Sequence, residues 1–183
     1  MALLHTPERQ DDFNAPDFTL KGVDGQMHTL NACKGENGTV IMFICNHCPY
    51  VIAVIDRIVA TSNKLAEHGI KTVAIMANDT ENYPADSFEN MKLFSEKYSF
   101  SFPYLIDETQ DIAKAYDAVC TPDIYGFDKD NVLQYRGRLD SAANKPADEN
   151  TVPELLNAMI EIKETGLVST TQTPSMGCSI KWK

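Results

Sequence analysis

The sequence lacks the features that direct a chain into or across a membrane. No hydrophobic run in its 183 residues approaches the roughly 18 apolar residues of a transmembrane helix. The segment from Met1 to Asn14 contains Arg9 but no apolar core, so no secretory signal is predicted. We therefore expect a cytoplasmic protein with no membrane partner, in a compartment where thiols stay mostly reduced.

Positive charge is also scarce. The chain has 16 Lys and Arg residues against 26 Asp and Glu residues, which gives a formal net charge of −10. An acidic surface repels the phosphates of nucleic acids and anionic lipids. We therefore expect no nucleic-acid partner.

Cysteines are few and odd in number, which excludes a framework in which every cysteine is paired within the chain. An odd count without a secretory signal favours redox or metal chemistry over static disulfides. The five residues are Cys33, Cys45, Cys48, Cys120 and Cys178.

Hydrophobic patterning predicts strands and helices in alternation. Two short strands, 15–20 and 26–30, flank an Asp24-Gly25 turn, and the continuous apolar run 39–44 predicts a central strand buried on both faces. Apolar residues at helical spacing predict a helix that begins at Pro49 and ends before Gly69. Strands are then predicted at 70–77, 102–106, 124–128 and 132–139, and helices at 88–98, 112–119 and from the capping box 151–154 to Gly166.

This order predicts an α/β fold with a central mixed sheet flanked by helices and an N-terminal β-hairpin extension. No internal repeat or long linker divides the chain, so we expect one domain over residues 1–183. The polar segment 1–14 and the Ser/Thr-rich segment 168–183 are expected to be loose or extended tails.

The strongest chemical signal is Cys45-Asn46-His47-Cys48-Pro49, a C-x-x-C motif between a strand and a helix. A thiol at a helix N-terminus faces free backbone N–H groups, which favour the thiolate. Such an environment can lower a cysteine pKa from about 8.5 to between ~3.5 and ~7.5. The motif therefore predicts a reactive dithiol.

This arrangement resembles the thioredoxin fold. The segment Ala15-Pro16-Asp17-Phe18-Thr19-Leu20 resembles the A-P-x-F-x-L start of peroxiredoxins and of membrane-tethered thioredoxins of cytochrome maturation. The string from Cys45 to Val51 and the end from Gly177 to Lys183 resemble a peroxiredoxin-like group of AhpC/TSA-type relatives. The similarity covers about residues 13–183. It implies that Pro122 is cis and packs against the C-x-x-C, and that Thr121 offers its backbone to an extended substrate.

The same resemblance bears on which cysteine attacks. Thioredoxins place the nucleophile five residues after a strand phenylalanine, and counting from Phe43 reaches Cys48. A rival register makes Cys45 the nucleophile. In the first register Cys45 stands where peroxiredoxins have Thr or Ser, and Pro122 stands where they have an arginine. Both losses disfavour efficient peroxide reduction.

Other residues of the motif region have open roles. His47 either stabilises a neighbouring thiolate or is an exposed loop residue. The strand 39–44 contains no Asp or Glu, so the buried carboxylate that thioredoxins use as a proton acceptor is expected to be absent. Cys120 and Cys178 are auxiliary redox candidates, or else a buried apolar residue and an unpaired thiol.

The sequence thus favours a thiol–disulfide oxidoreductase with Cys48, Cys45, His47, Thr121 and Pro122 in its site. We expect no cofactor and no metal for this activity, a protein or small-molecule disulfide substrate, and a thiol electron donor; a homodimer is left open. One alternative is a weak thiol peroxidase or peroxide sensor with an antioxidant role. Another is a copper or other metal-binding thioredoxin-fold protein that uses Cys45, His47 and Cys48.

Overall fold

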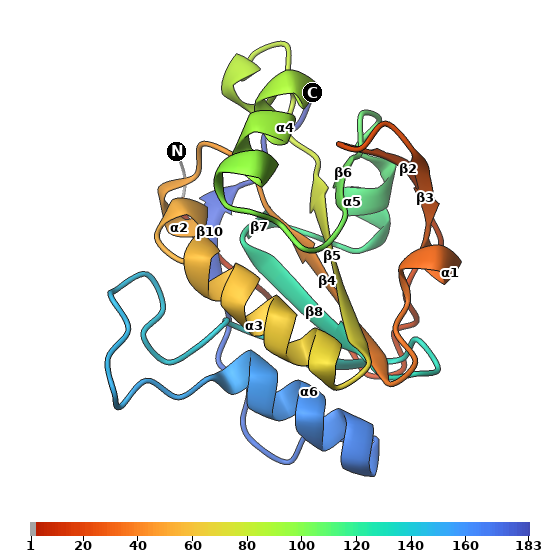
Figure 1. The fold of residues 1–183 in the computed structure, drawn as a ribbon, viewed down its shortest axis with the longest axis vertical. Helices are drawn as coiled ribbons and strands as arrows, with labels where there is room; N and C mark the ends of the chain where they lie inside the picture. The colour runs from red at the N-terminus through yellow and green to blue at the C-terminus, as the bar shows by residue number, and fades with distance from the viewer. Residues whose placement is uncertain (1–2) are drawn as a thin grey trace.

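The computed structural model describes residues 3–183, and its centre is a seven-stranded mixed sheet (Figure 1). Strands run in the order β3-β2-β6-β5-β4-β8-β9, with β4, β5 and β6 parallel and the other neighbours antiparallel. This confirms the predicted mixed sheet. The strands are β2 (Thr19–Gly22), β3 (Met27–Thr29), β4 (Gly38–Phe43), β5 (Ile70–Met76), β6 (Tyr104–Ile106), β8 (Asp123–Phe127) and β9 (Leu133–Arg136).

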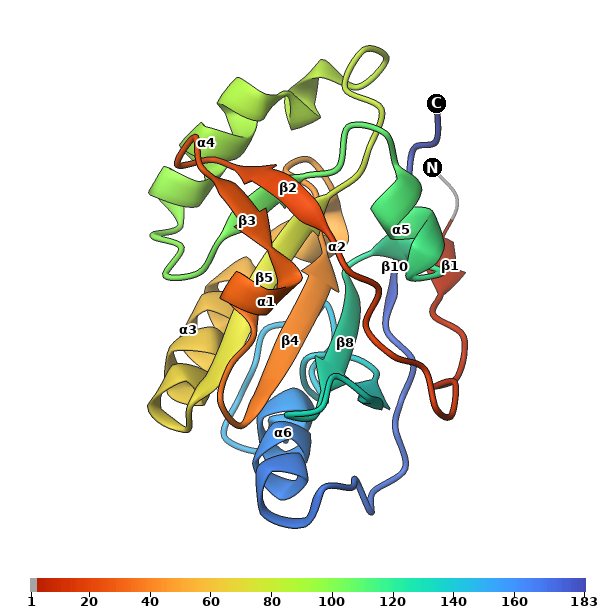
Figure 2. The same cartoon turned by 90° about the vertical axis from the view of Figure 1, so that its right-hand side faces the viewer.

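Helices cover both faces of this sheet, as Figures 1 and 2 show together. Alternate residues of β4 divide the core: Val40 and Met42 pack with α3 and α6, whereas Ile41 and Phe43 pack with α1 and α5. Every residue of β4 is buried, as expected for a strand covered on both sides. The helices are α1 (Leu30–Cys33), α2 (Pro49–Ile52), α3 (Ile55–Glu67), α4 (Phe88–Lys97), α5 (Asp111–Ala115) and α6 (Glu154–Thr165), with a 3₁₀ turn, η1 (Pro84–Asp86).

The N-terminal hairpin forms as predicted from Asp24-Gly25. Strand β2 pairs with β3 in a register that joins Thr19 to Thr29. Gly25 has a φ of +80°, a conformation that side chains with a Cβ rarely adopt. The hairpin extends the sheet through the pairing of β2 with β6.

A second, three-stranded sheet contains parts of the two segments, 1–14 and 168–183, that the sequence predicted to be loose or extended tails. It joins β1 (Leu3–His5), β10 (Met176–Ser179) and β7 (Cys120–Thr121) in that order. Thr6 and Ser175 also exchange hydrogen bonds, 2.9 Å between N and O and 3.0 Å between Oγ1 and N. Part of each segment is therefore fixed by strand pairing, Leu3–His5 in the first and Met176–Ser179 in the second.

Two local predictions about helices are wrong. The helix predicted after Cys48 is interrupted at Ala53 and Val54, where the N–H of Val54 bonds to the carbonyl of Val51 three residues earlier. The capping box at 151–154 does not form, because both of its side chains have other partners. Thr151 accepts from the Asp148 N–H at 2.9 Å, and Glu154 binds Arg138 at 2.7 Å.

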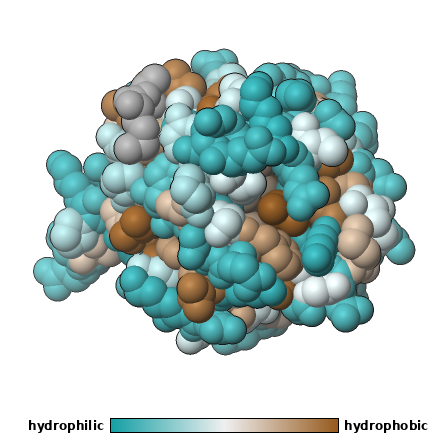
Figure 3. All heavy atoms as spheres, turned by 90° about the horizontal axis from the view of Figure 1, so that it is seen from above, coloured by the Kyte–Doolittle hydropathy of each residue, from teal (hydrophilic) through white to brown (hydrophobic). Residues whose placement is uncertain are grey.

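The surface agrees with the acidic, hydrophilic composition. Over the face viewed in Figure 3, apolar residues lie scattered in small groups among hydrophilic ones. Within residues 3–183, no helix is both long and apolar enough to cross a membrane.

Candidate active site

The loop between β4 and α2 holds the C-x-x-C motif at the end of the central strand. Cys48 is the residue that precedes the first turn of α2, and Pro49 occupies that turn as predicted. Both cysteine side chains are buried, with Cys48 0% and Cys45 1% exposed. All five cysteines are free thiols in this structure. The fold thus places both sulfurs of the motif beneath the surface.

Thr121 lies against this dithiol, and its bond to Pro122 is cis, as the resemblance implied. The Cys48 Sγ lies 3.1 Å from the carbonyl oxygen of Thr121, a contact in which the neutral thiol donates. The Cys45 Sγ lies 3.5 Å from the Thr121 Oγ1. Thr121 therefore contacts both thiols, one through its backbone and one through its side chain.

The two thiols differ in acidity. A hydrogen bond from the Cys45 thiol lowers the pKa of Cys48, while hydrogen bonds from Cys178 and Thr121 and from the Val51 backbone act in the same direction. The same interaction with Cys48, together with burial and the nearby Asp86, raises the pKa of Cys45. Because α2 is only four residues long, these hydrogen bonds rather than the helix dipole hold the thiolate on Cys48.

Strand β10 occupies the backbone edge that the sequence assigned to a substrate. Cys178 pairs with Thr121, and Ser179 pairs with Cys120, in an antiparallel register. At Gly177 an added Cβ would lie 2.0 Å from the Thr121 carbonyl oxygen, so only glycine allows this approach. In this conformation, Thr121 does not offer its backbone to an external segment.

The auxiliary cysteines separate into two environments. Cys178 lies in the same core cluster as Cys45 and Cys48, and burial, followed by its interaction with Cys48, raises the pKa of its own thiol. Cys120 is buried, its Sγ lies 3.7 Å from the Pro122 carbonyl oxygen, and burial raises its pKa. Cys33 packs in the other half of the core, on the opposite side of β4. Cys178 is thus the auxiliary thiol that the structure brings into contact with the dithiol.

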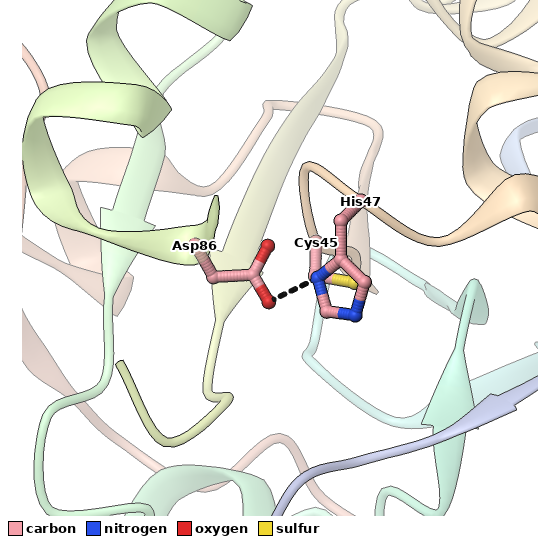
Figure 4. Close-up of side chains that lie close together, drawn as sticks. All are labelled: Cys45, His47 and Asp86. Atoms are coloured by element: carbon pink, nitrogen blue, oxygen red, sulfur yellow. Dashed lines mark ion pairs between the residues drawn. The ribbon is translucent and has the colours of Figure 1, made fainter. Parts of the chain in front are cut away.

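Asp86 is a site residue that sequence reasoning did not assign to the site. It lies just before α4, but Ser87 and not Asp86 caps that helix, by accepting a hydrogen bond from the Asn90 N–H. The Asp86 side chain is completely buried and points toward His47 and Cys45 (Figure 4). A buried carboxylate is therefore present after all, supplied by η1 instead of β4.

The Asp86 carboxylate is fixed by three neighbours. Its Oδ1 accepts from the Asn46 N–H at 2.8 Å, and its Oδ2 accepts from the Asn78 side chain at 2.8 Å. The His47 Nδ1 lies 2.7 Å from Oδ2. That contact is short, but its angle does not satisfy hydrogen-bond geometry, so we describe it as an ion-pair contact.

His47 itself is held in place. Its ring stacks on Tyr83, with the ring centroids 5.9 Å apart and the planes 7° apart. One donor atom from each of Cys45, His47 and Asp86 lies within 4.8 Å of the other two. A thiol, an imidazole and a carboxylate at this spacing can exchange a proton or share a metal ion.

Tyr104 stabilises the loop that holds the C-x-x-C motif. Its hydroxyl donates to the Asn46 Oδ1 at 2.9 Å. Burial raises its pKa, which keeps the phenol neutral and able to donate. Asn46 therefore links the motif both to Tyr104 and to Asp86.

Comparisons with known proteins agree with this geometry. The sequence pattern of the AhpC/TSA family matches residues 13–136. The crystal structure of an uncharacterized conserved protein from Geobacillus kaustophilus is 45% identical, with a TM-score of 0.93 over 100% of this chain and 97% of that one.

Two further relatives carry names that point to redox chemistry. Thioredoxin-like protein YneN of Bacillus subtilis is 24% identical over 127 residues, 68% of this chain and 69% of that protein. Thiol-disulfide oxidoreductase ResA of Geobacillus thermodenitrificans is 23% identical over 123 residues, 66% of this chain and 64% of that protein. The match to the family pattern covers more than half of the chain and coincides with a thioredoxin-like sheet and a buried dithiol. This protein therefore belongs to the AhpC/TSA family and is a redox enzyme with a thioredoxin-like fold.

Proposed function

We propose that the protein is a thiol–disulfide oxidoreductase in which Cys48 attacks and Cys45 resolves. The observation that carries the proposal is the contact of both thiols with Thr121, the residue before cis Pro122. The lower pKa of Cys48 supports its role as the attacking thiolate, since the thiolate is the nucleophile.

The first step is an exchange at sulfur. The Cys48 thiolate attacks one sulfur of a substrate disulfide, a Cys48–substrate disulfide forms, and the other substrate sulfur leaves as a thiolate. The hydrogen bonds that stabilise the Cys48 thiolate also make Cys48 a good leaving group in the reverse of this step, so release of the substrate depends on attack by Cys45.

The second step requires the proton of Cys45 to leave. Cys45 has the raised pKa and lies near Asp86 and His47, which are placed to accept that proton. The Cys45 thiolate then attacks Cys48, the Cys45–Cys48 disulfide forms, and the second substrate sulfur leaves as a thiolate. An external dithiol returns the pair to the reduced state by the same chemistry in reverse.

The substrate class we propose is a small disulfide. Strand β10 already pairs with Thr121, so an extended polypeptide would have to displace it. A cavity of about 310 Å³ lies beside Pro122, between Tyr50, Val54 and Met176, and its lining is mostly apolar. Neither cysteine side chain lines this cavity, but it offers space for the carbon part of a small disulfide beside Pro122, the residue that follows Thr121.

The test is turnover of a small aromatic disulfide by variants of single cysteines. Cys48→Ser is expected to abolish reduction, because no thiolate remains to attack. Cys33→Ser is the matched control: it removes a buried thiol on the other side of β4 and should leave turnover within about twofold. Unchanged turnover in Cys48→Ser would overturn the assignment of the nucleophile.

A second candidate, a slow thiol peroxidase, is favoured by the burial of Cys48, which a small hydroperoxide passes more easily than a disulfide. The Cys48 thiolate would take the terminal oxygen, giving a sulfenic acid and an alkoxide, and Cys45 would condense with it to a disulfide and water. Stopped-flow oxidation of the reduced protein by hydrogen peroxide tests this. A rate no faster than that of free cysteine would exclude it.

A further inference from the structure

We propose that Cys45, His47 and Asp86 form a Zn²⁺ site in the reduced protein. The site is a binding function distinct from disulfide exchange, because it needs the Cys45 thiolate but no turnover. It is assembled from the C-x-x-C loop and from η1, two segments about 40 positions apart in the sequence (Figure 4).

The donor spacing is close to that of a zinc site. Zinc binds sulfur at about 2.3 Å and nitrogen or oxygen at about 2.0–2.2 Å, so tetrahedral ligands lie about 3.4–3.6 Å apart. The three donors here lie within 4.8 Å of one another, and the His47 Nδ1 is 2.7 Å from the Asp86 Oδ2. A metal requires the imidazole and carboxylate to separate slightly and the thiolate to move closer, which are side-chain adjustments.

The charges also match a dication. Asp86 is fully buried, and among residues 3–183 its one ionic contact is with His47, which is a base rather than a fixed cation. A Cys45 thiolate beside this carboxylate would place two negative charges in a buried space, which is costly without compensation. Zn²⁺ neutralises both and leaves imidazole as a neutral ligand.

The ligands are preorganised by their neighbours. The stacking on Tyr83 holds the His47 ring, and the Nδ1 has no partner that satisfies hydrogen-bond geometry. Asn46 and Asn78 hold the carboxylate. Such contacts behind the ligands fix their orientation in metal sites.

The ligand set favours zinc over copper. Cu(I) prefers soft thiolates, whereas one thiolate, one imidazole and one carboxylate suit a borderline ion such as Zn²⁺. The His47 side chain is 23% exposed, which leaves an approach for the ion and for a water in the fourth position. The sequence suggested copper bound by Cys45, His47 and Cys48. With Asp86 as a ligand in place of Cys48, the expected metal is zinc.

Binding and oxidation exclude each other at Cys45. When Cys45 attacks a Cys48–substrate disulfide, its sulfur forms a bond to the Cys48 sulfur, the substrate sulfur leaves as a thiolate, and the thiolate ligand of the metal is lost. Each oxidation of the dithiol therefore releases one Zn²⁺, and each reduction restores the site.

The experiment is titration of the reduced, chelator-treated full-length protein with Zn²⁺ against a chromophoric chelator, with Co²⁺ as a spectroscopic probe. We expect one ion per chain and a thiolate-to-cobalt charge-transfer band. Cys45→Ser, His47→Asn and Asp86→Asn should each weaken binding at least tenfold. The disulfide form of the unmodified protein should not bind.

The matched control is His28→Asn. His28 and Asp24 form a similar pair, 3.0 Å apart, on the surface and without a cysteine in their group. This variant should bind as the unmodified protein does. Equal affinity in His47→Asn and the unmodified protein would overturn the site, and so would zinc binding by the disulfide form.

If Asp86→Asn does not fold, a comparison of zinc binding by the reduced and the disulfide forms of the unmodified protein still tests the proposal. Disulfide turnover by the metal-free unmodified protein separates the two proposals: turnover in a protein that does not bind zinc would reject the metal site alone, and zinc binding without turnover would reject the dithiol activity alone.

Discussion

The two sides of the Cys48 thiol differ in the chemical groups that line them. On the loop side lie Cys45, His47 and Asp86, which are close in space and able to exchange protons. On the strand side lie Thr121 and Cys178, joined by backbone pairing between β7 and β10. The loop side is suited to chemistry, and the strand side is suited to controlling what reaches the thiol.

This difference shows that a thiol does not gain a catalytic role merely by lying next to Cys48. Cys45 and Cys178 both lower the pKa of Cys48, and both have raised pKa values themselves. Cys45, however, has a carboxylate and an imidazole within reach, whereas Cys178 belongs to a paired strand. We therefore expect the two thiols to respond differently to the same substitution.

The largest contrast should appear when each of these cysteines is changed to serine. Cys45→Ser should stop multiple turnover after one attack and accumulate a covalent Cys48–substrate disulfide, because no second thiolate resolves it. Cys178→Ser should retain at least about half of the turnover. Intact mass spectrometry and steady-state rates measure both. Trapping in Cys178→Ser instead would assign the resolving role to the strand side.

A smaller effect is expected when the loop side loses its buried carboxylate. Asp86→Asn keeps the size of the side chain but removes the proton acceptor, and general-base catalysis typically contributes about 10²–10⁴-fold. We expect resolution by Cys45 to slow by about 10²-fold while the first attack by Cys48 changes little. Rapid-quench measurement of the mixed disulfide separates the two steps.

The pH dependence distinguishes this role from simple support of the loop. With Asp86 absent, the rate of resolution should rise with pH until Cys45 ionises unaided, and because burial still raises the pKa of this thiol, that point lies above the ordinary cysteine value of about 8.5. Asp24→Asn, at the exposed pair with His28, serves as the control. A rate of resolution that is low at every pH would indicate structural damage.

Some features of the fold and of the site could be predicted from the sequence, and others could not. The alternating strands and helices, the hairpin at Asp24-Gly25 and the position of the C-x-x-C are local patterns, and the structure has each of them. Asp86 lies about 40 residues from Cys45, and no periodic pattern links the two, so only the fold brings them together.

Strand β10 was missed for a related reason. Met176 to Ser179 has a glycine and a serine where most strands have β-branched or aromatic residues, so its own propensity for a strand is weak. Its conformation is imposed by pairing with β1 and β7, strands of three and two residues. Tertiary contacts, not the sequence of the segment, decide its structure.

Displacing strand β10 on the strand side should change the ratio of insulin reduction to small-disulfide reduction by a moderate factor. Gly177→Ala places a Cβ 2.0 Å from the Thr121 carbonyl oxygen, which forces β10 away from β7. We expect insulin reduction to increase several-fold relative to reduction of a small aromatic disulfide. Gly166→Ala, at a glycine with open space far from the dithiol, controls for a general loss of stability. An unchanged ratio of the two rates would reject β10 as the barrier to polypeptides.

The smallest predicted effect concerns the acidity of Cys48 itself. Its lowered pKa means that the reduced protein, held free of metal, should be alkylated by iodoacetamide at pH values well below about 8.5, where an ordinary thiol is protonated. Because Cys45 provides the largest contribution, Cys45→Ala, which removes the donor, should raise the pH midpoint more than Cys178→Ala, which we expect to raise it by less than about one unit. Mass mapping of the alkylated residue at each pH measures both. A larger shift in Cys178→Ala than in Cys45→Ala would mean that the strand side, and not the loop side, holds the thiolate.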